Sequence, residues 1–291
     1  MSTRLRPVIV LAVLCWVALP LTAGAAIGSA LADSPSAVRT VAFVLAWGAW
    51  VAGLAALLLP HPLGVTVLRV CAVAVVGGTA WATVVAPGAT LHLVGLAVAA
   101  LAAGTTQHPE LVDRCVDGGS YGPERRFALR TPVVLLAGPV PLAAAVVAAG
   151  LGTGPLLVAA GRIVPGVVAL VVGLPAAVAA GRALHGLAAR ILVFVPAGFV
   201  LADRAALVDP VLVRAASLDR LGVAERTTTA TDLTLGAAGL VLEADLAGPM
   251  TVGRRSGRRD ATTTELSAFL FSPLRPGAFL GEAAARGLRV G

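Results

Sequence analysis

Apolar residues follow one another in long runs through about the first 180 positions, with only short polar breaks such as "PHPLG" and "APGA" between them. A helix needs about 20 apolar residues to cross the hydrocarbon core of a bilayer. We therefore expect residues 1–182 to form an α-helical membrane bundle of about six transmembrane helices, or five if the short fourth run does not cross. The runs occupy residues 8–31, 40–59, 64–86, 88–104, 133–151 and 155–180.

A different pattern begins near residue 185. The segments "ILVFV" and "GFVLAD" are short and rich in β-branched and aromatic side chains, and the turn-forming "PAG" separates them. Acidic residues and arginines recur every few positions after Asp203, which is incompatible with lipid. This stretch is therefore predicted to be a β-hairpin rather than a seventh span.

Further short segments predict five more strands and a terminal helix. The strand segments are "LVDPVLVRA", "SLDRLGV", "GLVLEADL", "PMTV" and "TELSAFLFS"; in "GLVLEADL" buried and wetter positions alternate. The last segment, "RPGAFLGEAAARGL", begins with Pro276 and pairs Glu282 with Arg286 at helical i,i+4 spacing. Residues 185–291 are thus expected to form a β-rich domain of about seven strands closed by a helix.

Composition supports the membrane assignment and limits the partners. The chain is 58% hydrophobic and 13% charged, with a mean hydropathy of +0.92, whereas soluble domains carry about 25% charged residues. The net charge of +7 comes entirely from arginines at membrane boundaries and in loops, without the interleaved aromatic residues of single-strand binders. We expect the lipid bilayer, and not nucleic acid, as a partner.

The distribution of arginines predicts the orientation in the cell membrane. With six spans and a cytoplasmic N-terminus, the inner segments carry most arginines, and the outer segments hold only Asp33 and Arg39. Such a positive-inside asymmetry places both termini in the cytoplasm. The alternative for the first run is a signal peptide, because "SALADS" resembles a cleavage site. The inner arginines are Arg4, Arg6, Arg69, Arg114, Arg125, Arg126, Arg130, Arg182 and Arg190.

Arg162 is the one charge that lies well inside an expected span. A buried charge in a membrane is costly and often marks a substrate or ion path, and Pro165 would free a backbone carbonyl nearby. Arg162 is therefore a candidate intramembrane polar site. The alternative is that its side chain reaches the outer surface.

The expected cytoplasmic loop 105–131 contains Gly118, Ser120 and Gly122 at the G-x-S-x-G spacing of a nucleophile elbow. That motif works on a strand-to-helix turn with a later histidine and acid. Pro123 follows directly, and the only later histidine, His185, lies at a membrane boundary. A serine hydrolase is therefore the third and least favoured hypothesis.

The same loop holds residues of metal-ligating types, namely His108, Glu110, Asp113, Cys115 and Asp117. No second cluster faces them in the sequence, and the three cysteines form no CxxC pair, so we expect no metal site and no disulfide framework. We interpret the segment as an ordered loop that caps the fifth span and docks on the C-terminal domain. Arg125 and Arg126 would then lie at the level of the lipid headgroups.

Two blocks of the C-terminal region resemble known bacterial domains. "FLFSPLRPGAFLGEAAARG" resembles the last strand, turn and helix of bacterial PH-like domains, and "ILVFVPAGFVLAD" resembles their first hairpin. With "DGGSYGPERRFALRTP", the whole chain is similar to an uncharacterised family of multi-pass membrane proteins of high-GC Gram-positive bacteria. The resemblance implies a cytoplasmic PH-like barrel over residues 185–291, and it implies no catalytic residue or cofactor.

A basic turn, "GRRSGRRD", is the strongest candidate for a membrane-surface or partner contact. Each arginine beside an anionic leaflet could contribute about 1 kcal/mol of attraction. The alternative is a solvated hairpin tip. The arginines are Arg254, Arg255, Arg258 and Arg259.

These observations favour a non-enzymatic scaffold or interaction protein at the cell membrane, which presents a PH-like module to another membrane or cytoplasmic protein. The chain has no lysine for a phosphate-binding loop and no HExxH motif, and we expect no cofactor. The alternative function is a small-molecule or lipid transporter that uses the helices around Arg162.

Overall fold

The computed structural model describes residues 7–86, 90–255 and 260–291. The chain forms two compact units. The helical unit comprises Met1–Cys115 and Gly138–His185, and the strand unit comprises Val116–Ala137 and Gly186–Gly291. The strand unit therefore contains an earlier chain segment in addition to the domain expected at 185–291.

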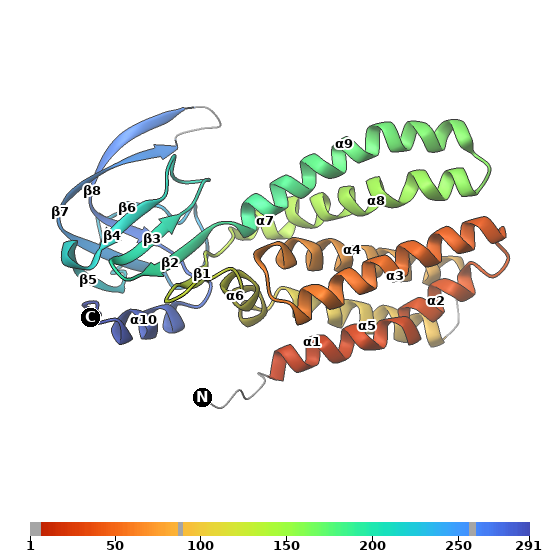
Figure 1. Cartoon of the computed structure of the whole chain (residues 1–291), viewed down its shortest axis with the longest axis horizontal. Helices are drawn as coiled ribbons and strands as arrows, with labels where there is room; N and C mark the ends of the chain where they lie inside the picture. Colours follow the sequence, from red (N-terminus) through yellow and green to blue (C-terminus); the bar gives the residue numbers. More distant parts are fainter. Residues whose placement is uncertain (1–6, 87–89, 256–259) are drawn as a thin grey trace. The chain divides into compact units, whose positions relative to one another are not determined.

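Long apolar helices build the helical unit (Figure 1). Among the described residues, five helical stretches are long and apolar enough to cross a membrane, and a sixth is obtained if α5 and α6, bent by 56°, count as one span. The expectation of a helical half with five or six such helices is confirmed. In chain order the elements are α1 (Pro7–Ala18), η1 (Leu19–Leu21), α2 (Ala23–Ala30), α3 (Ser36–Leu58), α4 (Pro62–Val85), α5 (Thr90–Thr106), α6 (Pro109–Asp117), α8 (Pro139–Ala159) and α9 (Ile163–Ala188).

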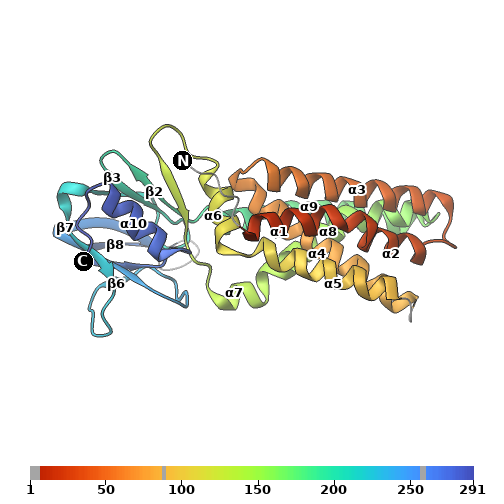
Figure 2. The same ribbon diagram turned by 90° about the horizontal axis from the view of Figure 1, so that it is seen from below.

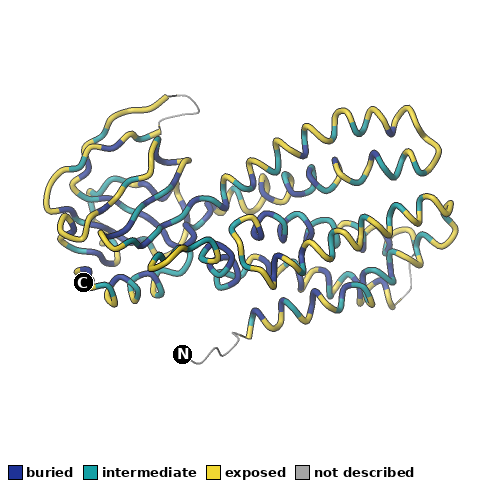
Figure 3. Tube along the Cα trace, in the orientation of Figure 1, coloured by how far each residue is buried: buried dark blue, intermediate teal, exposed yellow. Residues whose placement is uncertain are grey.

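The surface of these helices is apolar over long stretches. Figure 3 shows mostly exposed positions along α3 and α9. On α9 these positions include large aliphatic residues such as Val167, Val168 and Val171. Apolar patches of this size are unfavourable in water and suit contact with lipid.

The boundary between the last two helices differs from the expected spans 133–151 and 155–180. The segment "GLGTG" is part of α8 rather than a loop. A Cβ atom on Gly150 would collide with the backbone oxygen of Gly173 on α9, and one on Gly154 would lie 2.5 Å from Cγ of Leu170. These glycines allow close packing of α8 on α9, as small residues do in membrane helices. The chain turns later, at Gly161, whose φ is 76°.

The described residues of the strand unit form two sheets, and the unit also contains the short helix α7 (Val133–Ala137). The first sheet has the order β1-β2-β3-β4, with β1 (Arg125–Ala128), β2 (Ile191–Val195), β3 (Gly198–Ala202) and β4 (Val211–Arg214). The second has the order β5-β7-β8-β6, with β5 (Leu218–Val223), β6 (Thr231–Asp232), β7 (Leu242–Arg255) and β8 (Ala261–Phe271); β6 pairs with β8 in parallel. A short η2 (Ala215–Ser217) and the helix α10 (Pro276–Ala285) complete the unit.

The expected strand-rich layout with a terminal helix is confirmed, and three details differ. The expected strands at "GLVLEADL" and "PMTV" are one long strand, β7. Two strands, β1 and β6, were not predicted. The sheets do not join into a closed barrel, so the PH-like fold stays a prediction.

Aromatic side chains from both sheets and from α10 form the core of the strand unit. Alternate positions of β2 and β3 point inward, and Phe194 and Phe199 are fully buried. Phe279 of α10, the helix visible against the strands in Figure 2, stacks on Phe194 with 4.7 Å between ring centroids. Phe127 of β1 meets both rings edge-on. The segment from the interhelical loop is therefore part of this core.

Candidate functional site

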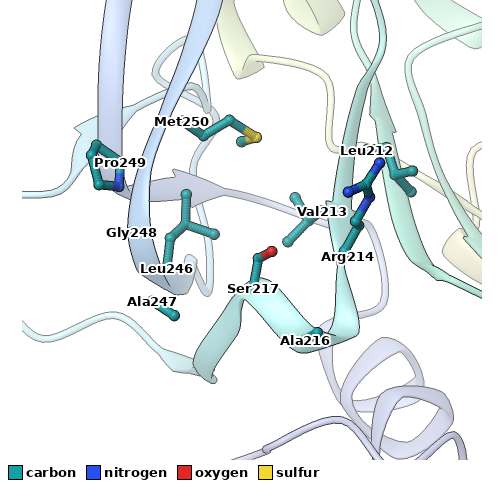
Figure 4. A pocket seen from close by; sticks show the side chains of 10 residues that line it. All are labelled: Leu212, Val213, Arg214, Ala216, Ser217, Leu246, Ala247, Gly248, Pro249 and Met250. Atoms are coloured by element: carbon teal, nitrogen blue, oxygen red, sulfur yellow. The ribbon is translucent and has the colours of Figure 1, made fainter.

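A groove of 540 Å³ opens in the strand unit where the two sheets face each other without pairing (Figure 4). One wall consists of β4 and η2, and the other consists of residues 246–250 of β7. Pockets that bind ligands commonly have volumes of about 300–1,000 Å³. We call this feature the β4–β7 groove.

The groove exists because, in the described chain, no strand pairs with the edges of β4 and of residues 247–249 that face the groove. Among the described residues β4 is an edge strand that pairs only with β3. The ladder between β7 and β8 shifts register between Asp245 and Met250, and residues 247–249 pair with neither β5 nor β8. Pro249 within this bulge has no N–H group to donate. An open seam results instead of a closed barrel.

The groove combines an apolar interior with a polar rim. Leu246 and Met250 point from β7 toward Val213 of β4 (Figure 4). Arg214 on β4 is exposed and has no hydrogen bond or ion pair within the part of the chain that the structure describes. Ser217 of η2 is also exposed and lines the groove. An unpaired guanidinium beside an apolar cleft favours a ligand that carries both apolar and acidic groups.

The loop with the G-x-S-x-G spacing is held in place by hydrogen bonds to Asp117. The Ser120 hydroxyl donates to Oδ1 of Asp117 at 2.9 Å, and the backbone N–H of Arg126 donates to the same oxygen at 2.9 Å. A serine nucleophile needs an adjacent base such as histidine. Asp117 is the one side-chain partner of Ser120 among the described residues.

A second carboxylate, Glu124, fixes the tip of the same loop. Its Oε2 accepts hydrogen bonds from Arg126 at 3.0 Å and from the backbone N–H of Tyr121 at 3.3 Å. The hydrogen bond from Arg126 is the main reason that the pKa of Glu124 is lower than its usual value. Across the described ranges, no group of three histidine, cysteine or acidic residues could hold a metal ion.

Both arginines that we expected at the headgroup level have partners within the strand unit. Arg125 forms an ion pair with Asp117, and its guanidinium lies 5.6 Å from the centre of the Phe127 ring. Arg126 forms an ion pair with Glu124. These contacts hold the loop against β1, and the predicted contact of the two arginines with lipid stays a prediction.

The basic turn lies partly outside the described residues. Arg258 and Arg259 lie outside the described residues. Arg254 donates to the backbone oxygen of Asp232 at 3.2 Å, and Arg255 donates to that of Leu207 at 3.3 Å. These two side chains thus tie the β7 end to neighbouring segments, and their binding to an anionic surface stays a prediction.

Comparison with known proteins identifies no relative of this chain. No protein-family model matches the chain, and searches of curated proteins and of solved structures find no significant match.

Arg162 is not inside a helix, contrary to the sequence-based expectation. It is exposed and directly precedes α9, in the turn that connects α8 and α9. The expectation failed because "GLGTG" was interpreted as the break between spans, which placed the next span too early. The structure thus places Arg162 in a turn rather than inside a helix, and an intramembrane polar site at this residue stays a prediction.

Arg69 is a buried arginine that we had assigned to an inner segment. It lies in the third turn of α4, is 6% exposed, and donates from Nε to Oε1 of Gln107 at 3.4 Å. Its Nη1 atom has no hydrogen-bond partner in the described chain. Its position five residues after the "PHPLG" break could have indicated this burial.

A second missed feature is a buried ion pair at the base of the β2–β3 hairpin. Arg190 contacts Asp203 through two hydrogen bonds of 2.9 and 2.8 Å, and their side chains are 2% and 1% exposed. Nη1 of Arg190 also donates to the backbone oxygen of Arg130 at 3.2 Å. The pair therefore joins the hairpin to the segment that follows β1. Its sequence signal is an arginine and an aspartate that flank "ILVFVPAGFVLA".

Proposed function

We propose that this protein is a membrane-anchored interaction protein without catalysis of its own. The helical unit holds it in the cell membrane, and the strand unit is a cytoplasmic PH-like module that binds a protein partner at the β4–β7 groove. The single observation that carries the proposal is the groove itself. It combines apolar side chains with the exposed Arg214 and with the edge of β4, and neither of these has a partner among the described residues on this side.

The strand unit has a well-packed core that can hold the walls of the groove in fixed positions. Its core is built from aromatic rings in direct contact, including Phe199 with Phe271 and Phe271 with Phe279. The buried pair of Arg190 and Asp203 links β2 to the end of β3. Binding sites on a well-packed framework lose little entropy when a partner docks.

The orientation is supported by the charge asymmetry of the sequence. Arginines concentrate in the segments that the six-span arrangement places inside, and the α8–α9 turn with Arg162 would face outward. This arrangement would place the strand unit in the cytoplasm, where a soluble or membrane partner can reach the groove.

A groove-filling substitution tests the function. A Cβ atom on Gly248 has no neighbour within 4 Å, so Gly248→Trp can fill the groove without a backbone clash. Gly281 on α10 is exposed and equally free of neighbours, and Gly281→Trp is the matched control. After mild cross-linking in native membranes, a partner should co-purify with the wild type and Gly281→Trp and be lost with Gly248→Trp. The same partner in all three samples would reject the groove as the binding site.

A second candidate function, transport of a small anionic molecule or lipid, is favoured by Arg69 rather than by Arg162. A buried guanidinium with an unsatisfied Nη1 in a helical bundle suits an anionic group. Proteoliposomes with the wild type would then move anions that the Arg69→Gln variant does not move. Equal flux in both would remove this candidate.

A further inference from the structure

This inference rests on the proposed function, since it describes how the partner occupies the β4–β7 groove. We infer that the partner inserts an extended segment that pairs with the free edge of β4, becomes a fifth strand of the first sheet, and places an acidic side chain beside Arg214.

The pairing of β4 with β3 determines which backbone groups of β4 are free. The N–H of Ala215 donates to the oxygen of Ala197 at 2.9 Å, and the register pairs Phe199 with Val213. In an antiparallel ladder alternate residues bond to the same neighbour. Residues 211, 213 and 215 therefore bond to β3. The N–H and C=O groups of Leu212 and Arg214 point to the open edge, where they can pair with an added strand.

The β7 wall of the groove cannot pair with an added strand. Residues 247–249 of β7 follow no regular ladder, and Pro249 lacks a donor. Irregular strands with proline are poor templates for strand addition. An incoming strand therefore pairs with β4, and β7 supplies the apolar wall against which its side chains pack.

The side chains around the edge define the chemistry of the segment. Val213 is buried, whereas Leu212 and Arg214 are exposed on the other face of β4. Side chains of an added strand alternate in the same way. One set would face Leu246 and Met250 and should be apolar, and the other would lie beside Arg214 and should be acidic. Because β4 has four residues, or about 14 Å, the paired part of the segment is short.

A designed peptide tests this geometry on the full chain in detergent micelles. The probe is a fluorescent peptide with the sequence Val-Glu-Val-Glu-Val, and the charge control is Val-Lys-Val-Lys-Val. Fluorescence anisotropy should show tighter binding of the glutamate peptide, by about threefold to fivefold for one partly exposed ion pair. The Arg214→Glu variant should reverse this preference. Equal affinity of both peptides for the wild type would overturn the acidic part of the inference.

Strand addition is tested by removing one donor from the free edge. Leu212→Pro deletes an N–H that β3 does not use, and Leu212→Ala keeps it while shortening the same side chain. Peptide binding should be lost in Leu212→Pro and retained within about threefold in Leu212→Ala, since a partly exposed side chain contributes little. Should Leu212→Pro fail to fold, a peptide methylated on alternate backbone nitrogens must lose binding to the wild type. Retained binding of the methylated peptide would overturn strand addition.

The outcomes separate this inference from the function on which it rests. Loss of partner co-purification in Gly248→Trp, together with normal co-purification in Leu212→Pro and Arg214→Glu, would keep the groove as the site and reject strand addition. Concentration-dependent dimers that disappear in Leu212→Pro would assign the edge to a second copy of this chain and overturn the assignment to a partner segment.

Discussion

At the scale of single residues, the strand unit contains buried charged side chains whose burial cannot be predicted from hydropathy. Arg190 and Asp203 lie 13 positions apart and are almost completely buried together. A buried ion pair is not a large net source of stability, but loss of one partner leaves an uncompensated buried charge. Hydropathy also did not predict that Arg162 is exposed in a turn and that Arg69 is buried, because burial depends on where each helix begins.

The Asp203→Ala variant should destabilise the strand unit by about 3–5 kcal/mol, because Arg190 would stay buried without its carboxylate. Replacing both residues with apolar ones, as Arg190→Met with Asp203→Leu, should recover most of this loss. Hydrogen exchange of β2 and β3 amides in the full chain measures both effects. Equal protection in the wild type and in Asp203→Ala would show that the pair is not buried as described.

At the scale of elements, the sequence predicted long helices and strands better than short ones. Extended apolar runs and the "PAG" turn located most helices and the β2–β3 hairpin. The four residues of β1 include two arginines, and their strand conformation comes from pairing with the distant β2. Phe127 pairs with Leu192, which lies 65 positions later in the chain. The glycines of "GLGTG" led to the prediction of a loop where the structure has part of α8. Glycine occurs both in loops and at close contacts between helices, so the sequence alone did not distinguish the two.

The contribution of β1 changes the expectation for the isolated C-terminal region. Residues 186–291 alone lack Phe127, which is 2% exposed and contacts Phe194 and Phe279. Removal of a buried phenylalanine costs about 3–5 kcal/mol. The excised fragment should therefore unfold at a clearly lower temperature than a fusion of residues 116–131 to it through a flexible linker.

Thermal circular dichroism of both proteins provides this comparison. As a control, the same fusion with Phe127→Ala should unfold between the two. Identical melting of the fragment and the fusion would show that β1 is not part of the folded unit.

At the scale of the whole molecule, the chain passes between the two units three times, at residues 115–116, 137–138 and 185–186. The strand unit is thus built from two segments that are separated in sequence by α8 and α9. The groove could not be predicted from the sequence, because it arises from a ladder that does not form between distant segments, β4 and β7.

The topology predicts opposite accessibility for two positions on either side of α9. A cysteine at Gly291 should react with a membrane-impermeant reagent only after permeabilisation, whereas Arg162→Cys should react in intact cells. The three native cysteines are buried and should give little background. Labelling of position 291 in intact cells would contradict the cytoplasmic placement of the strand unit.

The central claim, that a partner protein occupies the β4–β7 groove, is tested most directly by site-specific photo-cross-linking in living cells. A photoreactive amino acid is placed at Ala216, which lines the groove, and for comparison at Ala284, an exposed position on α10. The account predicts a discrete cross-linked product from position 216 that is absent from position 284 and disappears when Gly248→Trp is added. No product from position 216, or one that persists unchanged in the Gly248→Trp background, would contradict it.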